Sequence, residues 1–132
     1  MVTRLTMVML VSVGGGAGCA ARFLAGAAVA AWLPRIASSF PLATLGVNVV
    51  GCTLAGALLA WLTPAAAADH PARLLLMTGF LGGLTTFSAF AVETLDLLDR
   101  SPAIGFASMA LNVLLSLVGA WGGMMVVRAI VS

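Results

Sequence analysis

Long stretches without a charged residue limit most strongly what this chain can fold into. Residues 5–21, 36–68, 74–92 and 101–127 contain no Asp, Glu, Lys or Arg. A helix that crosses the hydrocarbon core of a bilayer needs about 20 mainly apolar residues. In a chain of 132 residues, of which 62% are hydrophobic, these stretches leave no room for a soluble domain. The sequence therefore predicts an all-α integral membrane protein with four transmembrane helices.

Prolines and tryptophans indicate where these helices end. Prolines begin or follow helices, and tryptophans at the ends of spans anchor them at the interface with water. The first helix is expected to stay in the protein, because Arg22 fits a removable signal peptide poorly. Short connections make consecutive helices antiparallel, so both termini should lie on one side of the membrane. We expect one transmembrane domain over residues 1–132, with helices at 5–32, 41–62, 72–98 and 103–131.

The basic residues bear on partners and on orientation in the membrane. All are arginines that lie singly beside apolar spans and form no basic stripe, so we expect a lipid bilayer, and no nucleic acid, as partner. With the N-terminus on side A, that side holds Arg4, Arg73 and Arg128, and side B holds Arg35 and Arg100. This near-balance barely selects an orientation. A chain that inserts both ways can form an antiparallel homodimer.

Small residues recur at a spacing of four along the predicted spans. The pairs are Gly14 and Gly18, Gly79 and Gly83, and Gly119 and Gly123. Such pairs let helix backbones approach closely in lipid, and we interpret them as packing sites. No lysine follows the glycine clusters, which excludes a phosphate-binding loop. The sequence also has no cluster of metal ligands and no nucleophile beside a base, so we expect no enzyme activity.

Polar side chains inside the predicted spans are costly, and each calls for an explanation. Thr44 and Asn48 lie one turn apart in the second span, and Ser108, Asn112 and Ser116 form a stripe in the fourth. A lone serine or threonine can bond a carbonyl of its own helix. An asparagine amide cannot be satisfied in that way. The two asparagines are therefore expected to face inward, either between helices or into a pathway.

The strongest local signal lies in the third span, at residues 79–90. This segment combines three glycines, the adjacent Thr85 and Thr86, and the aromatic pair Phe87 and Phe90. Each glycine weakens a helix by about 1 kcal/mol relative to alanine. A broken helix is tolerated at membrane depth only where its freed backbone groups are buried in protein or line a cavity. The segment predicts a break in the third helix, whose carbonyls could hold a cation.

Taken together, these motifs resemble the Fluc (CrcB-type) family of fluoride channels. The matching segments are residues 15–22, which end at Arg22, residues 44–51, and residues 79–90 followed by Glu93. The resemblance implies a fluoride-selective channel of the cell inner membrane that passively exports cytoplasmic fluoride and lowers its toxicity. It also implies a dual-topology homodimer with two pores.

The resemblance assigns roles to residues as well. Arg22 is expected to lie toward an aqueous vestibule, and the backbone carbonyls of Gly82 and Thr85 to hold a structural Na⁺ at the dimer centre. Ser108 departs from the family pattern, because many members have tyrosine there; Ala43 and Ala89 are milder departures. The residues expected to line the fluoride pore are Asn48, Phe87, Phe90, Ser88, Asn112 and Ser116.

Two other functions stay open at this point. A small multidrug-type proton-coupled antiporter also has four helices, but it needs an ionisable acid deep in the first helix. The first span here contains Arg22 and no acid. A membrane assembly subunit that transports nothing is the other alternative, which a flux assay separates from a channel.

Overall fold

The computed structural model describes residues 3–62 and 70–131, and all regular secondary structure within them is helical. The elements are α1 (Arg4–Trp32), α2 (Pro34–Ala37), α3 (Leu42–Leu62), the π-helix η1 (Arg73–Leu81), α4 (Gly82–Leu84), α5 (Phe87–Arg100) and α6 (Pro102–Val131). Within these described residues, four segments are long and apolar enough to cross a membrane: Arg4–Trp32, Leu42–Leu62, Arg73–Arg100 and Pro102–Val131. The predicted all-helical class with four spans is thereby confirmed.

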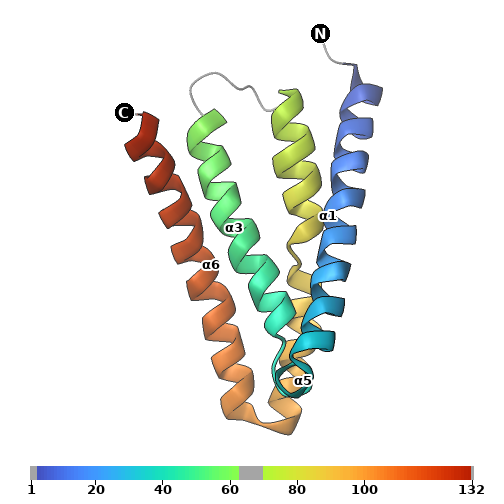
Figure 1. Cartoon of the computed structure of the whole chain (residues 1–132), viewed down its shortest axis with the longest axis vertical. Helices are drawn as coiled ribbons and strands as arrows, with labels where there is room; N and C mark the ends of the chain where they lie inside the picture. Colours follow the sequence, from blue (N-terminus) through green and yellow to red (C-terminus); the bar gives the residue numbers. More distant parts are fainter. Residues whose placement is uncertain (1–2, 63–69, 132) are drawn as a thin grey trace.

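The long helices alternate in direction along the chain (Figure 1). The two termini lie at one end of the bundle, and the α5–α6 connection lies at the other. The connection after α1 differs from the expected linker, because it contains the short helix α2. Pro34 at the first position of α2 explains this turn of helix, since its fixed φ suits a helix start and its missing N–H costs nothing there.

Local sequence explains how several helices begin. The hydroxyl of Thr3 caps α1 by accepting a hydrogen bond from the amide of Thr6, at 3.2 Å. A proline opens α6, as it opens α2. The third span differs from an ordinary α-helix, because it begins as the π-helix η1. Such helices are rare, and they are frequently found at functional sites.

Glycines allow α1 to pack closely along η1 and α4. A side chain added at Gly18 would meet the carbonyl oxygen of Phe80, and one at Gly83 would meet the carbonyl oxygen of Gly15. The helix backbones themselves are therefore in contact. The interpretation of these glycine pairs as packing sites is confirmed.

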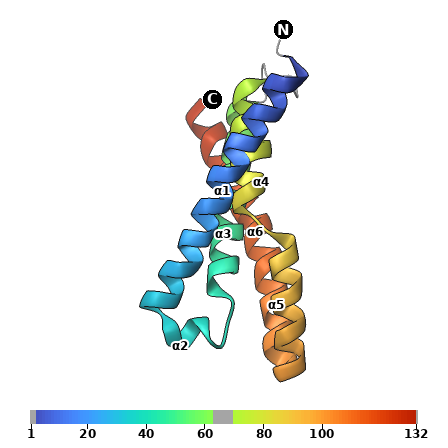
Figure 2. The same ribbon diagram turned by 90° about the vertical axis from the view of Figure 1, so that its right-hand side faces the viewer.

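The same kind of contact joins α3 to α6, which lie side by side and run in the same direction (Figure 1). A side chain at Gly123 would meet the carbonyl oxygen of Thr53, and one at Gly56 would meet that of Ala120. Toward the opposite end, α1 and α5 diverge (Figure 2). The result is a thin bundle whose two halves separate on the side of α2 and the α5–α6 connection.

The outer faces of the helices are apolar. Phe23 on α1 is 74% exposed and Val13 is 66% exposed. Water would penalise such a surface, whereas lipid chains do not. The structure thus supports a multi-pass membrane protein.

Candidate functional site

The third span changes conformation at Thr85 and Thr86, between α4 and α5. Both residues have extended backbones, with φ −78° and ψ 153° at Thr85 and φ −149° and ψ 120° at Thr86. The hydroxyl of Thr85 donates to the carbonyl of Leu81, at 2.9 Å. The hydroxyl of Thr86 caps α5 by accepting from the amide of Ala89, at 3.2 Å. The two threonine hydroxyls therefore pair with backbone groups on either side of the extended segment, the carbonyl of Leu81 and the amide of Ala89.

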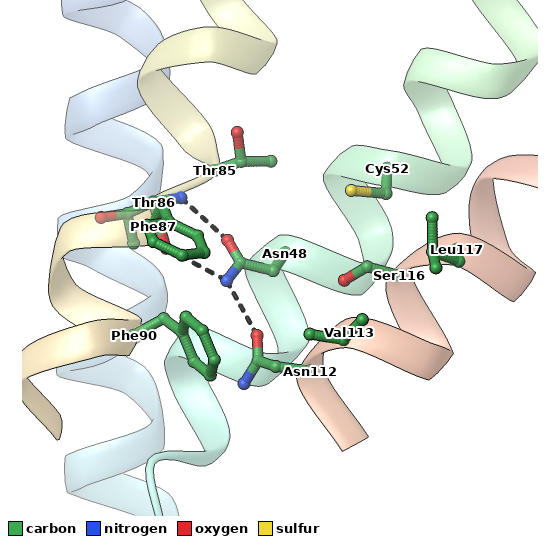
Figure 3. Close-up of a pocket in the computed structure, with 10 residues that line it drawn as sticks. All are labelled: Asn48, Cys52, Thr85, Thr86, Phe87, Phe90, Asn112, Val113, Ser116 and Leu117. Atoms are coloured by element: carbon green, nitrogen blue, oxygen red, sulfur yellow. Dashed lines mark hydrogen bonds between the residues drawn. The ribbon is translucent and has the colours of Figure 1, made fainter. Parts of the chain in front are cut away.

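Asn48 on α3 holds this extended segment through its side-chain amide (Figure 3). The amide N–H of Thr86 donates to Asn48 Oδ1 at 2.8 Å, and Asn48 Nδ2 donates to the carbonyl of Thr86 at 3.2 Å. Asn48 Nδ2 also donates to Asn112 Oδ1 on α6, at 2.9 Å. A backbone N–H needs an oxygen, so Thr86 determines which way the Asn48 amide faces. Both Nδ2 hydrogens of Asn48 are then used.

The orientation of Asn112 follows from that of Asn48. Asn112 must present its oxygen to Asn48 Nδ2, and its own Nδ2 faces elsewhere. This Nδ2 has no partner among the described residues, although the Asn112 side chain is only 4% exposed. Buried amide groups are nearly always hydrogen-bonded. The Asn112 NH₂ is therefore a buried donor without a partner among the described residues.

Asn48 and Asn112 border a hollow of about 300 Å³, which also contains the aromatic pair (Figure 3). Phe87 and Phe90 meet edge to face, with ring centroids 5.4 Å apart and planes at 62°. Phe90 is 7% exposed, whereas Phe87 is 78% exposed. The hollow is lined by Asn48, Cys52, Thr85, Thr86, Phe87, Phe90, Asn112, Val113, Ser116 and Leu117.

Most of the residues expected in a pore thus gather at this hollow. Ser88 does not line it, and its hydroxyl instead lies 3.3 Å from that of Thr86. Cys52 was missed by the sequence reasoning, although it lies one turn beyond Asn48 on the polar face of α3. That spacing was the signal that could have found it.

Arg22 and Gly82 lie away from the lining of the hollow. Arg22 Nε donates to the carbonyl of Gly83 on α4, at 3.2 Å. The amide of Thr86, which a continuous helix would turn toward the carbonyl of Gly82, donates to Asn48 instead. The carbonyl of Gly82 therefore lacks its helical donor, and Gly82 is exposed on the surface of the chain.

A second polar cluster lies one helical turn from the asparagines, toward α2. Thr44 Oγ1 donates to Glu93 Oε1 at 2.9 Å. Glu93 Oε2, Thr94 Oγ1 and Ser108 Oγ have no partner among the described residues, and Ser108 is fully buried. Glu93 also borders a smaller hollow of about 150 Å³, which lies between α5 and the turn before α3. Polar groups thus continue from the asparagine pair toward this end of the bundle.

The chain is similar to known proteins over nearly its whole length. The family model described as CrcB-like protein, Camphor Resistance (CrcB), matches residues 9–124. A protein of Rhizobium etli named fluoride-specific ion channel FluC is 41% identical over 125 residues, which cover 93% of this chain and 97% of the relative. The protein of the same name from Geobacter sulfurreducens is 41% identical over 128 residues, covering 94% and 98%. One from Pseudomonas fluorescens is 40% identical over 118 residues, covering 89% and 93%.

Proposed function

The chain belongs to the CrcB-like family, and on this premise we propose that it is a subunit of a fluoride-selective channel. Its role is then the passive export of cytoplasmic fluoride, which lowers the toxicity of that ion. The observation that carries the proposal is the buried Asn112 amide, a donor without a partner in the described structure that lines one hollow with Phe87 and Phe90.

Fluoride is a small ion that accepts hydrogen bonds strongly, so a selective path must replace its water with donors. Ser116 lines the hollow with a hydroxyl, and Asn112 borders it with a buried Nδ2 that has no partner among the described residues. Phenylalanine has a positive ring edge, which can face an anion. The apolar residues of the lining are Phe87, Phe90, Val113 and Leu117. Asn48 acts by holding Thr86 and orienting Asn112.

The interruption at Thr85 and Thr86 is, in this proposal, a break of the third membrane helix that builds the pathway. Irregular backbone at membrane depth requires partners in protein or a polar cavity. Asn48 supplies such partners to Thr86. The break also brings the N-terminus of α5 to the hollow. That end of a helix carries partial positive charge and favours an anion.

We propose further that the working unit is an antiparallel, dual-topology homodimer in the cell inner membrane. Phe87 borders the hollow yet is 78% exposed, so the hollow is incompletely walled in one chain. A second copy would complete the wall. The arginine near-balance supports opposite insertion, because Arg4 and Arg73 begin α1 and η1 at one end, and Arg100 ends α5 at the other.

A structural Na⁺ at the centre of this dimer is the third part of the proposal. Neutral carbonyl oxygens suit a hard cation, and the exposed Gly82 carbonyl without its helical donor fits that chemistry. The carbonyl of Thr85, within the extended segment, is the second candidate ligand. When bound, the cation supplies positive charge that favours a nearby anion.

The antiporter alternative is not favoured. Between its ends, α1 contains Arg22 and no acidic residue to carry protons. A subunit that transports nothing would leave the unpartnered donor of Asn112 without a ligand.

A flux measurement tests the proposal. Purified protein in liposomes should release fluoride to an ion-selective electrode and leave chloride inside, whereas empty liposomes retain both ions. Equal fluxes of fluoride and chloride, or no flux of either ion, contradict the proposal.

A further inference from the structure

The helices α3 and α6 keep a constant register along the line where they meet, here called the α3–α6 seam. Asn48 donates to Asn112 at 2.9 Å. Two turns further along both helices, a side chain on Gly56 would meet the carbonyl oxygen of Ala120. In both contacts, the residue on α6 follows its partner on α3 by the same number of positions. Because the two helices are parallel, residues between these contacts that are separated by the same number of positions also lie opposite each other.

Cys52 and Ser116 form the pair between these two contacts. Each lies one turn beyond an asparagine of the seam, Cys52 after Asn48 and Ser116 after Asn112. Both line the hollow, and the sulfur of Cys52 lies on the same side of α3 as the Asn48 amide (Figure 3). The cysteine is half-buried and not in a disulfide.

The seam closes directly beyond this pair. Side chains at Gly56 and Gly123 would overlap the backbone of the facing helix, so α3 and α6 touch there without space for an ion. On the other side of the pair lies Asn112, whose buried Nδ2 has no partner among residues 3–62 and 70–131. The lining of the hollow therefore ends, along the seam, near Cys52 and Ser116.

We propose that fluoride leaves the α3–α6 seam between Cys52 and Ser116, so that the Cys52 thiol faces the ion path. This inference rests on the proposed function. A thiol donates hydrogen bonds weakly, so Cys52 marks the end of the strong donors. The thiol can also be modified chemically, and a group attached to Cys52 would obstruct the ion path.

The chain offers a matched control, because its other cysteine, Cys19, lies exposed on α1 and outside the hollow. The variant Cys19→Ser keeps only the pathway thiol, and Cys52→Ser keeps only the control thiol. Each variant is reconstituted in liposomes and treated with methyl methanethiosulfonate. The thiolate attacks the reagent sulfur, methanesulfinate leaves, and a methyl disulfide forms on the cysteine. Mass spectrometry measures the extent of modification.

Fluoride flux is compared with the flux of the same variant before treatment. In Cys19→Ser the flux should fall by about tenfold, because added bulk closes a narrow pore, and dithiothreitol should restore it. In Cys52→Ser, modification of Cys19 should leave the flux at its starting value. A variant with permanent bulk, Cys52→Leu, should lose flux where Cys19→Leu does not, with both eluting as the wild-type species in gel filtration.

The outcomes separate this inference from the proposed function. If untreated Cys19→Ser and wild-type protein carry no selective fluoride flux, the proposed function fails and this inference with it. If they conduct and Cys52→Leu conducts equally well, the inference alone is overturned. Complete modification of Cys52 without loss of flux overturns it too.

Discussion

Asn48 provides Thr86 with both a hydrogen-bond donor and an acceptor, at 3.2 Å and 2.8 Å. The side chain thereby substitutes for helical partners at the point where the third span is extended. Its remaining hydrogen goes to Asn112 Oδ1, so one residue links three of the four spans. The Nδ2 of Asn112, which has no partner among the described residues, is a consequence of this link.

The variant Asn48→Asp should impair both stability and transport. A carboxylate can still accept from Thr86 N–H, but it cannot donate to the carbonyl of Thr86 or to Asn112 Oδ1. Each acceptor left unsatisfied costs about 1–3 kcal/mol. We expect a lower thermal midpoint in detergent and loss of fluoride flux from liposomes. Wild-type stability in this variant would show that the Asn48 links are not needed to hold the extended backbone at Thr86.

Asn112→Leu should lower the fluoride flux by about tenfold or more, since losing one donor to the ion costs on the order of 1.4 kcal/mol or more. The folded bundle should lose less stability than in Asn48→Asp, because Asn112 contributes only one accepted hydrogen bond to the described structure. The matched control is Leu111→Asn, which keeps Asn112 and adds an amide at an exposed position of α6. This control should keep the fluoride flux. Normal fluoride flux in Asn112→Leu would contradict the proposal that Asn112 donates a hydrogen bond to the ion.

Replacing the aromatic pair should remove the positive ring edges while keeping the bulk. Phe87→Ile and Phe90→Ile should each reduce fluoride flux, because isoleucine has no positive ring edge to face the ion. Phe106 on α6 is exposed and does not line the hollow, so Phe106→Ile serves as the control. If both hollow variants conduct as the control does, the rings only pack.

Glycine packing in the α3–α6 seam can be tested by stability alone. Gly56→Ala should destabilise the protein by about 1–3 kcal/mol, because the new methyl group collides with the backbone of Ala120. Gly122 lies in the same helix as Ala120 and has nothing near its missing side chain. Gly122→Ala should therefore raise helix stability by up to about 1 kcal/mol. Thermal unfolding in detergent distinguishes the two, and equal effects would contradict the packing account.

The proposed dual topology predicts that two variants forced into opposite orientations restore fluoride resistance to cells only when they are expressed together. Lysines added beside Arg4 and Arg73 should force one orientation, and lysines added beside Arg35 and Arg100 should force the other. Each variant alone should leave cells sensitive to fluoride, because an antiparallel dimer needs both orientations. Co-expression should restore resistance. Full protection by one variant alone would require abandoning the antiparallel arrangement.

The main features of the fold could be predicted because their causes are local. Each end of the four spans lies within two residues of its predicted position, since the length of an apolar run and the nearby prolines determine it. The glycine pairs also show in sequence that backbones must meet. The sequence does not show which backbone each glycine meets: nothing in residues 14–18 indicates that Gly18 lies against Phe80.

For the candidate site, sequence determined which residues share a helix face, and tertiary structure decided what each side chain does there. Helical periodicity alone places Asn48 with Thr44, and Asn112 with Ser116, on polar stripes. The choice of hydrogen-bond partners depends on the register of α3 against α6 and on the extended backbone at Thr86. These segments are far apart in the chain, so no local pattern specifies that both Nδ2 hydrogens of Asn48 are used while the Nδ2 of Asn112 has no partner in the described structure. The same register brings Cys52 and Ser116 to one hollow, a pairing of two distant segments that no local pattern specifies.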